Sequence, residues 1–358
     1  MRRPLVTPPP LPERGTIGVV TPSFPAHVRF REKYQHGLDT LRSLGFTVIE
    51  GSLTARATSE CYRAGPPCAR AAELQALFED EAVDAIVATI GGHNSSSLLP
   101  FLDFDAIRAN PKVFCGYSDV TSLHLGLLAR AGLRTFYGPA VMPSFGEWPT
   151  VLPETLASFL DATRRHVAGA RALVAPSRWS RHFRDILSGA WKTEARRMED
   201  NPGWRVLRPG QVRASALVAN LNTLLTLAGT GDFPEVEGRV LFLEEMNATH
   251  AQLERNLRHL EALGVLDRAA CLVLSKPEFV GDEGAAFGLD ALVLEVLGAR
   301  TLPVVVDFDA GHTVPMLTLA EETVVEVDAS GAYATVTVCE PMVACRARGA
   351  TAATPTRG

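Results

Sequence analysis

Three short apolar runs in the first third of the chain place the strongest constraint on its fold. They are Thr16–Val20 (TIGVV), Ala85–Thr89 (AIVAT) and Val113–Gly116 (VFCG), and all are rich in aliphatic residues. Continuous apolar runs of this length are typical of strands that are buried on both faces of a parallel sheet. The sequence therefore predicts such a sheet in this part of the chain.

Helical patterns separate these predicted strands. Residues Glu32–Leu44 and Ala69–Phe78 each place apolar side chains at helical spacing, and each pattern ends at a glycine or an acidic stop. The alternation of strand and helix predicts an α/β fold, with an N-terminal, parallel-sheet, Rossmann-like domain over residues 1–165.

The rest of the chain is expected to form a second domain. Residues 166–210 are rich in Arg and Trp and show no sustained periodicity, so we interpret them as a connecting segment. Residues 211–345 predict a smaller C-terminal mixed α/β domain, and the small, polar residues 346–358 predict a disordered tail. The expected elements of the second domain are helices at Leu217–Leu227, Gln252–Leu263 and Leu289–Leu297 and strands at Arg239–Glu244, Cys271–Leu274, Val304–Val306 and Thr323–Val327.

Composition limits the class of partner. The chain has 358 residues, of which 46% are hydrophobic, and this is enough for large buried cores. Its net charge of −5 argues against a nucleic-acid polymer as partner, because phosphate neutralisation needs a surplus of Lys and Arg. A small-molecule or peptide partner is expected instead.

The N-terminus and the cysteines favour a cytoplasmic location. Prolines interrupt the opening MRRPLVTPPPLPERG, no apolar signal core follows it, and no apolar run is long enough to span a bilayer. We therefore expect no membrane association. The six cysteines have neither C-x-x-C nor zinc-ligand spacing, so we interpret them as reduced thiols.

The segment VFCGYSDVTSLHLGLL is the sharpest chemical signal. A predicted buried strand ends at Gly116 and a helix begins a few residues later, which leaves Ser118 at the turn between them. A serine there has an exposed hydroxyl next to the positive end of a helix, as a nucleophile requires. Val120 stands where the hydrolase elbow has a second glycine, and the alternative is that Ser118 or Asp119 only caps the helix.

A second loop, ATIGGHNSSSLL, follows another predicted strand. Its glycines, Gly91 and Gly92, allow backbone amides to approach a ligand closely and to act as oxyanion donors. The alternative is an ordinary turn that Asn94 or Ser95 caps.

Two further predicted strands end in polar residues. Glu244 and Glu245 follow one strand, and Asp307, Asp309 and His312 follow the other. Histidine is the natural base for a serine hydroxyl, and a buried carboxylate can orient the imidazole. The alternatives are helix caps or solvent-facing acids, and a divalent-metal site, which we rank lower because the ligand spacing matches no known pattern.

Taken together, segments from nearly the whole chain resemble the LD-carboxypeptidase family of serine peptidases, and within it the microcin C self-immunity branch. The segments are GTIGVVTPSFPA, YRAGPPCARAAEL, ATIGGHNSSSLLPFLDFDAIRANPKVFCGYSDVTSL, TFYGPAVMPSFGE, NPGWRVLRPG, LVANLNTLLTLAGT, GRVLFLEEMNA and AGHTVPMLTL. Their order along the chain is more specific than any single motif.

The resemblance implies a Ser-His-Glu triad. The family's nucleophile in its GYSD motif falls on Ser118, the glutamate of its LFLED-like motif on Glu244, and the histidine of its GHT-like motif on His312. His312 would remove the Ser118 proton while Glu244 orients the imidazole, and water would hydrolyse the acyl-enzyme. No metal and no organic cofactor are expected.

The resemblance also implies an oxyanion hole made of backbone amides, from Asp119 and from Gly91 or Gly92. We expect Asn94 and Asn220 among the substrate contacts, together with Trp179 or Trp191. In the microcin branch a loop tryptophan stacks on the nucleobase, whereas either tryptophan here could instead be a packing anchor.

The substrate stays open at this point. The favoured hypothesis is an aminoacyl or peptidyl nucleotide such as processed microcin C, because YRAGPP and HTVPMLTL lean towards that branch. The alternatives are a murein tetrapeptide, cleaved in cell-wall recycling, and a catalytically silent binding protein. Since family members are typically homodimers, a homodimer is expected.

Overall fold

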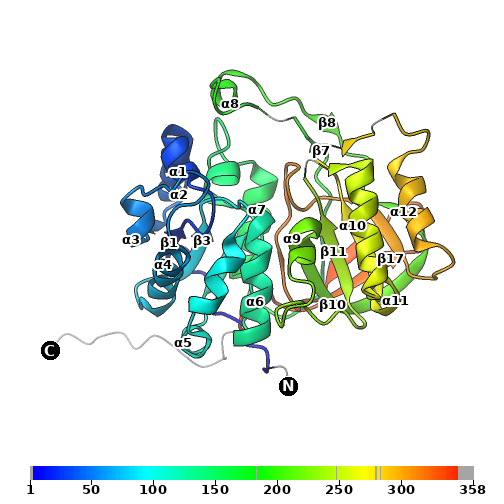
Figure 1. The fold of residues 1–358 in the computed structure, drawn as a ribbon, viewed down its shortest axis with the longest axis horizontal. Helices are drawn as coiled ribbons and strands as arrows, with labels where there is room; N and C mark the ends of the chain where they lie inside the picture. The colour runs from blue at the N-terminus through cyan, green and yellow to red at the C-terminus, as the bar shows by residue number, and fades with distance from the viewer. Residues whose placement is uncertain (1–2, 183, 247, 279, 283, 346–358) are drawn as a thin grey trace.

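Six strands form the first sheet, in the order β16-β5-β4-β3-β1-β2. The computed structural model describes residues 3–182, 184–246, 248–278, 280–282 and 284–345 (Figure 1). The strands are β1 Thr16–Val20, β2 Thr47–Glu50, β3 Ala85–Ala88, β4 Val113–Gly116, β5 Phe136–Tyr137 and β16 Leu319–Ala320. All neighbours pair in parallel except β16, which is antiparallel to β5. The order reverses between β1 and β3, which is where doubly wound sheets bind ligands beyond the carboxyl ends of their strands.

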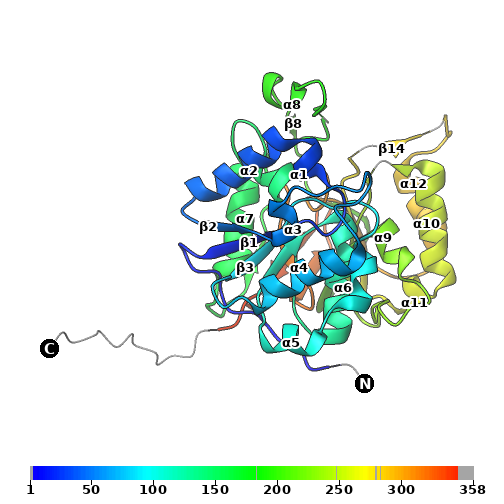
Figure 2. The same cartoon turned by 60° about the vertical axis from the view of Figure 1, so that its left-hand side comes forward.

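Helices cover both faces of this sheet. They are α1 Ala26–Arg29, α2 Arg31–Ser43, α3 Ser52–Ala55, α4 Pro67–Glu79, α5 Phe104–Ala109, α6 Thr121–Ala131 and α7 Pro153–Arg164, with the 3₁₀ helices η1 Ser95–Phe101 and η2 Ser118–Val120 and the π helix η3 Val141–Phe145. Residues Ile17 and Val19 share a core with α2 and α7, whereas Ile86 and Phe114 share another with α4 and α6. Figure 2 shows β1 to β3 between α2 and α4. Because successive side chains of a strand point to opposite faces, both faces must be apolar.

The second sheet has eight strands in the order β6-β18-β17-β10-β11-β13-β15-β9. They are β6 Arg171–Ala172, β18 Thr335–Val338, β17 Val324–Ala329, β10 Gly210–Asn220, β11 Val240–Glu244, β13 Cys271–Ser275, β15 Val304–Phe308 and β9 Arg205–Arg208. The four central strands, β10, β11, β13 and β15, are parallel, and the outer strands are antiparallel. The predicted fold class, α/β with a second mixed α/β part, is confirmed.

Leucine-rich helices cover one face of the second sheet. They are α9 Leu221–Thr226, α10 His250–Ala262, α11 Val265–Arg268 and α12 Leu289–Leu297. Their side chains share a core with Leu241 and Leu272, whereas Val218, Phe242 and Val273 point to the opposite face and join the core of the first sheet. One apolar core therefore runs from the first sheet into the second.

Polar contacts also join the two halves of the molecule. Arg130 of α6 forms a two-pronged ion pair with Asp232, with N–O distances of 2.6 and 2.5 Å. The Asn220 N–H donates to Thr121 Oγ1 at 3.0 Å, at the start of α6. Figure 1 shows α6 and α9 where the halves meet. These contacts, at the end and at the start of α6, fix the two halves of the molecule relative to each other.

The predicted helix at Leu217–Leu227 is wrong in its first part. The chain continues as strand β10 to Asn220, and only Leu221–Thr226 is helical. Residues 216–219 are fully buried between two layers, and a short, continuously apolar run has no periodicity that separates a buried strand from a buried helix. Asn220 ends the strand and caps α9, because its side chain accepts the Thr223 N–H.

Residues 166–210, which we expected to connect two domains, contribute strands β6 and β9 to the edges of the second sheet. Between them a hairpin-like ribbon, β7 Arg178–Trp179 and β8 Glu199–Asp200, carries the short helix α8 Ala190–Thr193. Figure 1 shows this excursion at the top of the molecule, beyond both halves. The predicted disordered tail, 346–358, lies outside the described residues. Within the described part of the chain, no helix has the length and apolar character needed to cross a membrane.

Candidate active site

Ser118 lies at a tight turn between β4 and α6. Its φ is +65°, in the left-handed region, and the preceding Tyr117 is extended. A left-handed non-glycine residue costs about 1–3 kcal/mol, and such strain gathers at functional sites. Val120 fits in place of a second glycine because Gly116 leaves room: a Cβ at Gly116 would lie 3.0 Å from Val120 Cγ1. Neither η2 nor α6 has a side-chain cap, so Ser118 does not serve as one.

The paired-glycine loop after β3 lies directly against Ser118. A Cβ at Gly91 would lie 3.0 Å from Ser118 Cβ and 3.1 Å from the Asp119 backbone nitrogen. Gly92 has a φ of +155°, and a Cβ there would collide with Ser23 Oγ. Within the described residues, neither glycine N–H donates a hydrogen bond. Two backbone donors therefore stay available beside the serine.

The Asp119 carboxylate ties this loop to the serine turn. It accepts the N–H groups of Asn94 and Ser95 at 3.0 and 2.9 Å, where η1 begins. Asn94 occupies the N-cap position of η1, but its side chain makes no cap and instead accepts a hydrogen bond from Arg70 at 2.7 Å. The carboxylate of Asp119 thus supports the loop geometry, and its backbone nitrogen faces Gly91.

Glu244 and His312 form a hydrogen-bonded pair across two parallel strands. Glu244 ends β11, His312 follows β15, and Glu244 Oε2 lies 2.7 Å from His312 Nδ1. The other carboxylate oxygen, Oε1, accepts the Tyr137 hydroxyl at 2.5 Å and Asn220 Nδ2 at 3.0 Å. A Cβ at Gly311, whose φ is +92°, would collide with Glu244 Oε2. Both oxygens of the Glu244 carboxylate therefore have hydrogen-bond partners. Only a glycine fits at position 311, because any side chain there would collide with this carboxylate.

Tyr137 links this pair to the serine turn. Its hydroxyl donates to Glu244 and accepts the backbone N–H of Ser118 at 3.1 Å. The His312 ring packs edge-on against Tyr117, with ring centroids 4.9 Å apart. Tyr117, the residue before Ser118, therefore packs against His312, and Tyr137 of the first sheet supports Glu244 of the second.

The pKa values of the pair shift in opposite directions. Burial by itself would raise the pKa of Glu244, but the charge of His312 and hydrogen bonds from His312, Tyr137 and Asn220 hold it below its ordinary value. Burial by itself would lower the pKa of His312, but Glu244, with a smaller contribution from Glu278, holds it above its ordinary value. The arrangement stabilises an imidazolium next to a carboxylate, as a proton-accepting histidine requires.

A pocket of about 710 Å³ brings most of the predicted site residues together. Ser118, His312, Gly91, Gly92 and Asn220 all line it, and Glu244 lies behind His312. Within the described residues no hydrogen bond joins the serine hydroxyl to the imidazole. Catalytic hydrogen bonds of this kind often tighten only when substrate binds.

The predicted substrate contacts divide into two groups. Asn220 lines the pocket, whereas Asn94, Trp179 and Trp191 are not among the described residues that line it. Trp191 belongs to α8 and is buried against Lys33, His36 and Trp148. Trp179 lies under the ammonium of Lys276, at 5.6 Å. Both tryptophans pack against protein groups in this structure, as expected if they anchor the fold and do not stack on a nucleobase.

Several residues that line the pocket or support its wall carried no usable sequence signal. Tyr137 sits in a two-residue strand within TFYGPA, and the resemblance pointed only to its neighbourhood. Lys33 belongs to α2, where an amphipathic pattern predicts that a lysine is exposed, yet it is buried and lines the pocket. Arg184, Arg196 and Glu278 come from loops without periodicity.

The acids at the end of β15 have structural partners. Asp309 is buried and accepts hydrogen bonds from Lys276 Nζ at 2.7 Å and from Trp204 Nε1 at 2.9 Å. Asp307 pairs with Arg205 at 2.5 Å. Among the described residues, no group of three or more acids, histidines or cysteines is placed to hold a metal ion.

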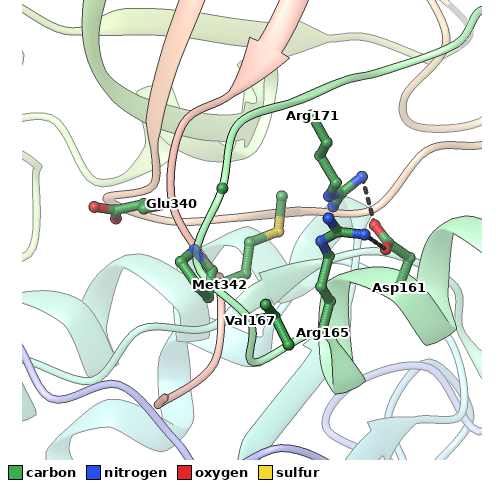
Figure 3. Close-up of a pocket in the computed structure, with 8 residues that line it drawn as sticks. Asp161, Arg165, Val167, Arg171, Glu340 and Met342 are labelled. Atoms are coloured by element: carbon green, nitrogen blue, oxygen red, sulfur yellow. Dashed lines mark ion pairs between the residues drawn. The ribbon is translucent and has the colours of Figure 1, made fainter.

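A second, shallow hollow lies beyond the end of α7 (Figure 3). Arg165 and Arg171 both point toward Asp161, at 3.8 and 2.5 Å. Its charges are already paired within the protein, so the large pocket is the candidate site.

Two family models match the chain. The model of the LD-carboxypeptidase N-terminal domain matches residues 17–138, and that of the LD-carboxypeptidase C-terminal domain matches residues 213–327. The chain is 37% identical to a protein of Vibrio cholerae named as a carboxypeptidase, over 84% of this chain and 88% of that protein. It is 36% identical to the microcin C7 self-immunity protein MccF of Escherichia coli, over 87% and 89% of the two chains.

Solved structures agree with these matches. The structure of MccF in complex with aspartyl sulfamoyl adenosine has a TM-score of 0.88 and 34% identity, over 95% of this chain and 100% of the other. MccF in complex with glutamyl sulfamoyl guanosine also has a TM-score of 0.88, with 33% identity over 94% and 99% of the chains. The chain therefore belongs to the LD-carboxypeptidase family and is a hydrolase of the carboxypeptidase type.

Proposed function

We propose that this protein hydrolyses an amide bond in an aminoacyl or peptidyl nucleotide by means of a Ser118–His312–Glu244 triad. The observation that carries the proposal is the 2.7 Å contact between Glu244 and His312 in the wall of the pocket that Ser118 enters from a strained turn. A strained serine, a carboxylate-bound histidine and a shared pocket are the components of nucleophilic acyl transfer.

In the first half of the reaction, Ser118 Oγ attacks the scissile carbonyl carbon. His312 takes the serine proton on Nε2, because Nδ1 faces Glu244. The same proton then passes to the leaving nitrogen, the C–N bond breaks, and an ester joins the acyl group to Ser118. Water enters, His312 takes a proton from it, and hydrolysis of the ester restores the serine.

The oxyanion of each tetrahedral intermediate needs donors beside Ser118. The N–H groups of Gly91, Gly92 and Asp119 are the candidates, and Gly91 lies close to both Ser118 and Asp119. The Ser118 N–H is already bonded to Tyr137, so it is not counted among them. Donors fixed by the backbone need no reorganisation when the charge develops.

Similarity to MccF supports the nucleotide substrate. MccF has been solved in complex with aminoacyl sulfamoyl nucleosides, and this chain matches those structures over nearly its whole length. The pocket volume, about 710 Å³, is in the range that encloses a ligand of that size. A protein of Bacillus subtilis named as a murein peptide carboxypeptidase is also related, at 27% identity, and gives the competing substrate class.

The test compares two substrates with purified protein. Wild type and Ser118→Ala are incubated with aspartyl sulfamoyl adenosine and with a murein tetrapeptide, and the released sulfamoyl adenosine or D-alanine is measured by chromatography. We expect wild type to cleave the nucleoside substrate and the variant to be inactive. Cleavage of the tetrapeptide alone would move the protein to the murein class. Turnover that persists in the variant would refute the triad, and no turnover of either substrate would indicate a binding protein.

We also propose that the protein acts in the cytoplasm as a homodimer, in line with its family resemblance. Size-exclusion chromatography with light scattering is expected to give a mass of about twice the 38.5 kDa of the chain. A mass of one chain, or recovery of the protein in a secreted or membrane fraction of its host, would contradict this proposal.

A further inference from the structure

Lys33 is a buried cation whose ammonium has no ion-pair partner among the described residues. Only 6% of its surface is exposed, although it projects from α2 into the wall of the pocket. Within the described residues its ammonium makes no hydrogen bond and no ion pair, and it lies over the ring of Trp191, 4.9 Å from the ring centroid. Burying an ammonium without an anionic partner is costly, so a ligand that supplies the anion would stabilise this arrangement.

The neighbouring carboxylate does not neutralise the charge of Lys33. Glu147 is the nearby carboxylate, and it is bound by Arg184 and, in a two-pronged contact at 3.0 and 2.8 Å, by Arg196. Both arginines also line the pocket. One carboxylate thus faces three cations, and this corner of the pocket has a surplus of positive charge. Burial accordingly lowers the pKa of Lys33 to about 8, against the smaller opposing effect of Glu147.

Helix packing and hydrogen bonds position this corner of the pocket. Helix α2 packs on η3, which contributes Met142 and Ser144 to the same pocket wall. Arg184 is itself buried, and it donates to the Glu194 carbonyl at 2.9 Å as well as to Glu147. The excursion with α8 is therefore tied to the N-terminal half, and the cations are positioned before any ligand arrives.

We propose that Lys33, with the field of Arg184 and Arg196, is the receptor for an anionic group of the substrate, a phosphoryl group or a carboxylate. The inference deepens the proposed function, since it assigns the charged end of the ligand to a corner of the pocket other than the Ser118 turn. It does not depend on the triad, because binding can be measured without turnover.

The experiment measures binding in a Ser118→Ala background by calorimetry at pH 7. The probes are adenosine monophosphate against adenosine, and N-acetyl-D-alanine against its amide, so that phosphoryl and carboxylate ligands are distinguished. The variant is Lys33→Met, which keeps the length of the side chain. The matched control is Lys192→Met, which removes a half-exposed lysine that also lies over Trp191, at 5.9 Å, and does not line the pocket.

We expect one anionic probe to bind at least ten-fold more tightly than its neutral partner. In Lys33→Met this ratio of affinities is expected to fall about ten-fold. Lys192→Met is expected to change it less than two-fold. Preference for the phosphate probe identifies a phosphoryl ligand, and preference for the carboxylate probe identifies a carboxylate. Equal affinity of Lys33→Met and its parent for both anions would overturn the proposal.

A second measurement needs no Lys33 variant. Affinity for the preferred anion in the Ser118→Ala protein is expected to fall several-fold as pH rises from 7 to 9.5, because the receptor loses its proton, whereas affinity for the neutral probe stays constant. The groups that face Lys33 are Glu147, Arg184, Arg196, His36, His182 and Lys192. A pH-independent affinity would also overturn the proposal.

Discussion

Glu244 Oε2 lies 2.7 Å from His312 Nδ1, although 68 residues separate them in the chain. The contact exists because β11 and β15 are parallel strands of one sheet, with β13 between them, so their carboxyl ends meet at one edge. The buried carboxylate stabilises the charged imidazole, and we expect this to determine the pH behaviour of the proposed reaction.

The first prediction concerns Glu244→Gln. A histidine that accepts a proton must be neutral, so with His312 as the proposed base kcat/KM of wild type is expected to rise with pH, through a midpoint above the ordinary histidine pKa of about 6.5. Removing the carboxylate charge leaves burial to dominate, so the midpoint should move below that of wild type, and kcat should fall about 10²- to 10⁴-fold. A full pH profile of both proteins tests this. An unchanged midpoint would show that Glu244 does not control the histidine.

A second prediction separates the chemistry of Ser118 from its strain. Ser118→Ala and Ser118→Gly both remove the hydroxyl and should both be inactive, but only glycine relieves the φ of +65°. After the larger chain entropy of unfolded glycine is subtracted, Ser118→Gly should be more stable than Ser118→Ala by about 0.5–1 kcal/mol. Urea unfolding of the two variants measures the difference. A less stable glycine variant would argue that the turn is not strained.

The third prediction is that Gly91→Ala damages catalysis more than folding. The added Cβ would lie 3.0 Å from Ser118 Cβ and 3.1 Å from the Asp119 nitrogen, in the space expected for the oxyanion. We expect kcat to fall about 10²- to 10³-fold, as for the loss of an oxyanion donor. The control is Gly231→Ala, at a glycine whose Cβ would meet nothing within 4 Å. Full activity in Gly91→Ala would place the oxyanion elsewhere.

The fourth prediction concerns the hydroxyl of Tyr137, which bridges the Ser118 N–H and Glu244. Tyr137→Phe leaves a buried donor unsatisfied and removes one donor from the carboxylate, so we expect a loss of about 1–3 kcal/mol in stability and roughly ten-fold in kcat. Tyr34→Phe is the control, because it removes a comparable hydrogen bond to Glu50, at 2.8 Å, outside the pocket lining. If both variants lose activity equally, the Tyr137 effect is a general loss of stability.

Local pattern determined much of the fold. The strands at Thr16–Val20 and Val113–Gly116 and the helix at Leu289–Leu297 have their predicted bounds, because burial on both faces and helical periodicity each leave a trace in neighbouring residues. The same reasoning failed at residues 217–220, where a strand and a helix would be equally apolar. Periodicity cannot decide between two buried elements.

Some residues of the candidate site could likewise be predicted from the sequence, and others could not. The sequence by itself marked Ser118, Glu244 and His312, since each follows a recognisable apolar strand and an ordered set of family motifs. Only the tertiary structure decided that Tyr137 bridges two of them, that Lys33 is buried over Trp191 in the pocket wall, and that Trp191 packs inside the protein. The physical reason is that these roles depend on contacts between segments distant in the sequence, created when the two sheets dock, and no local pattern encodes such contacts.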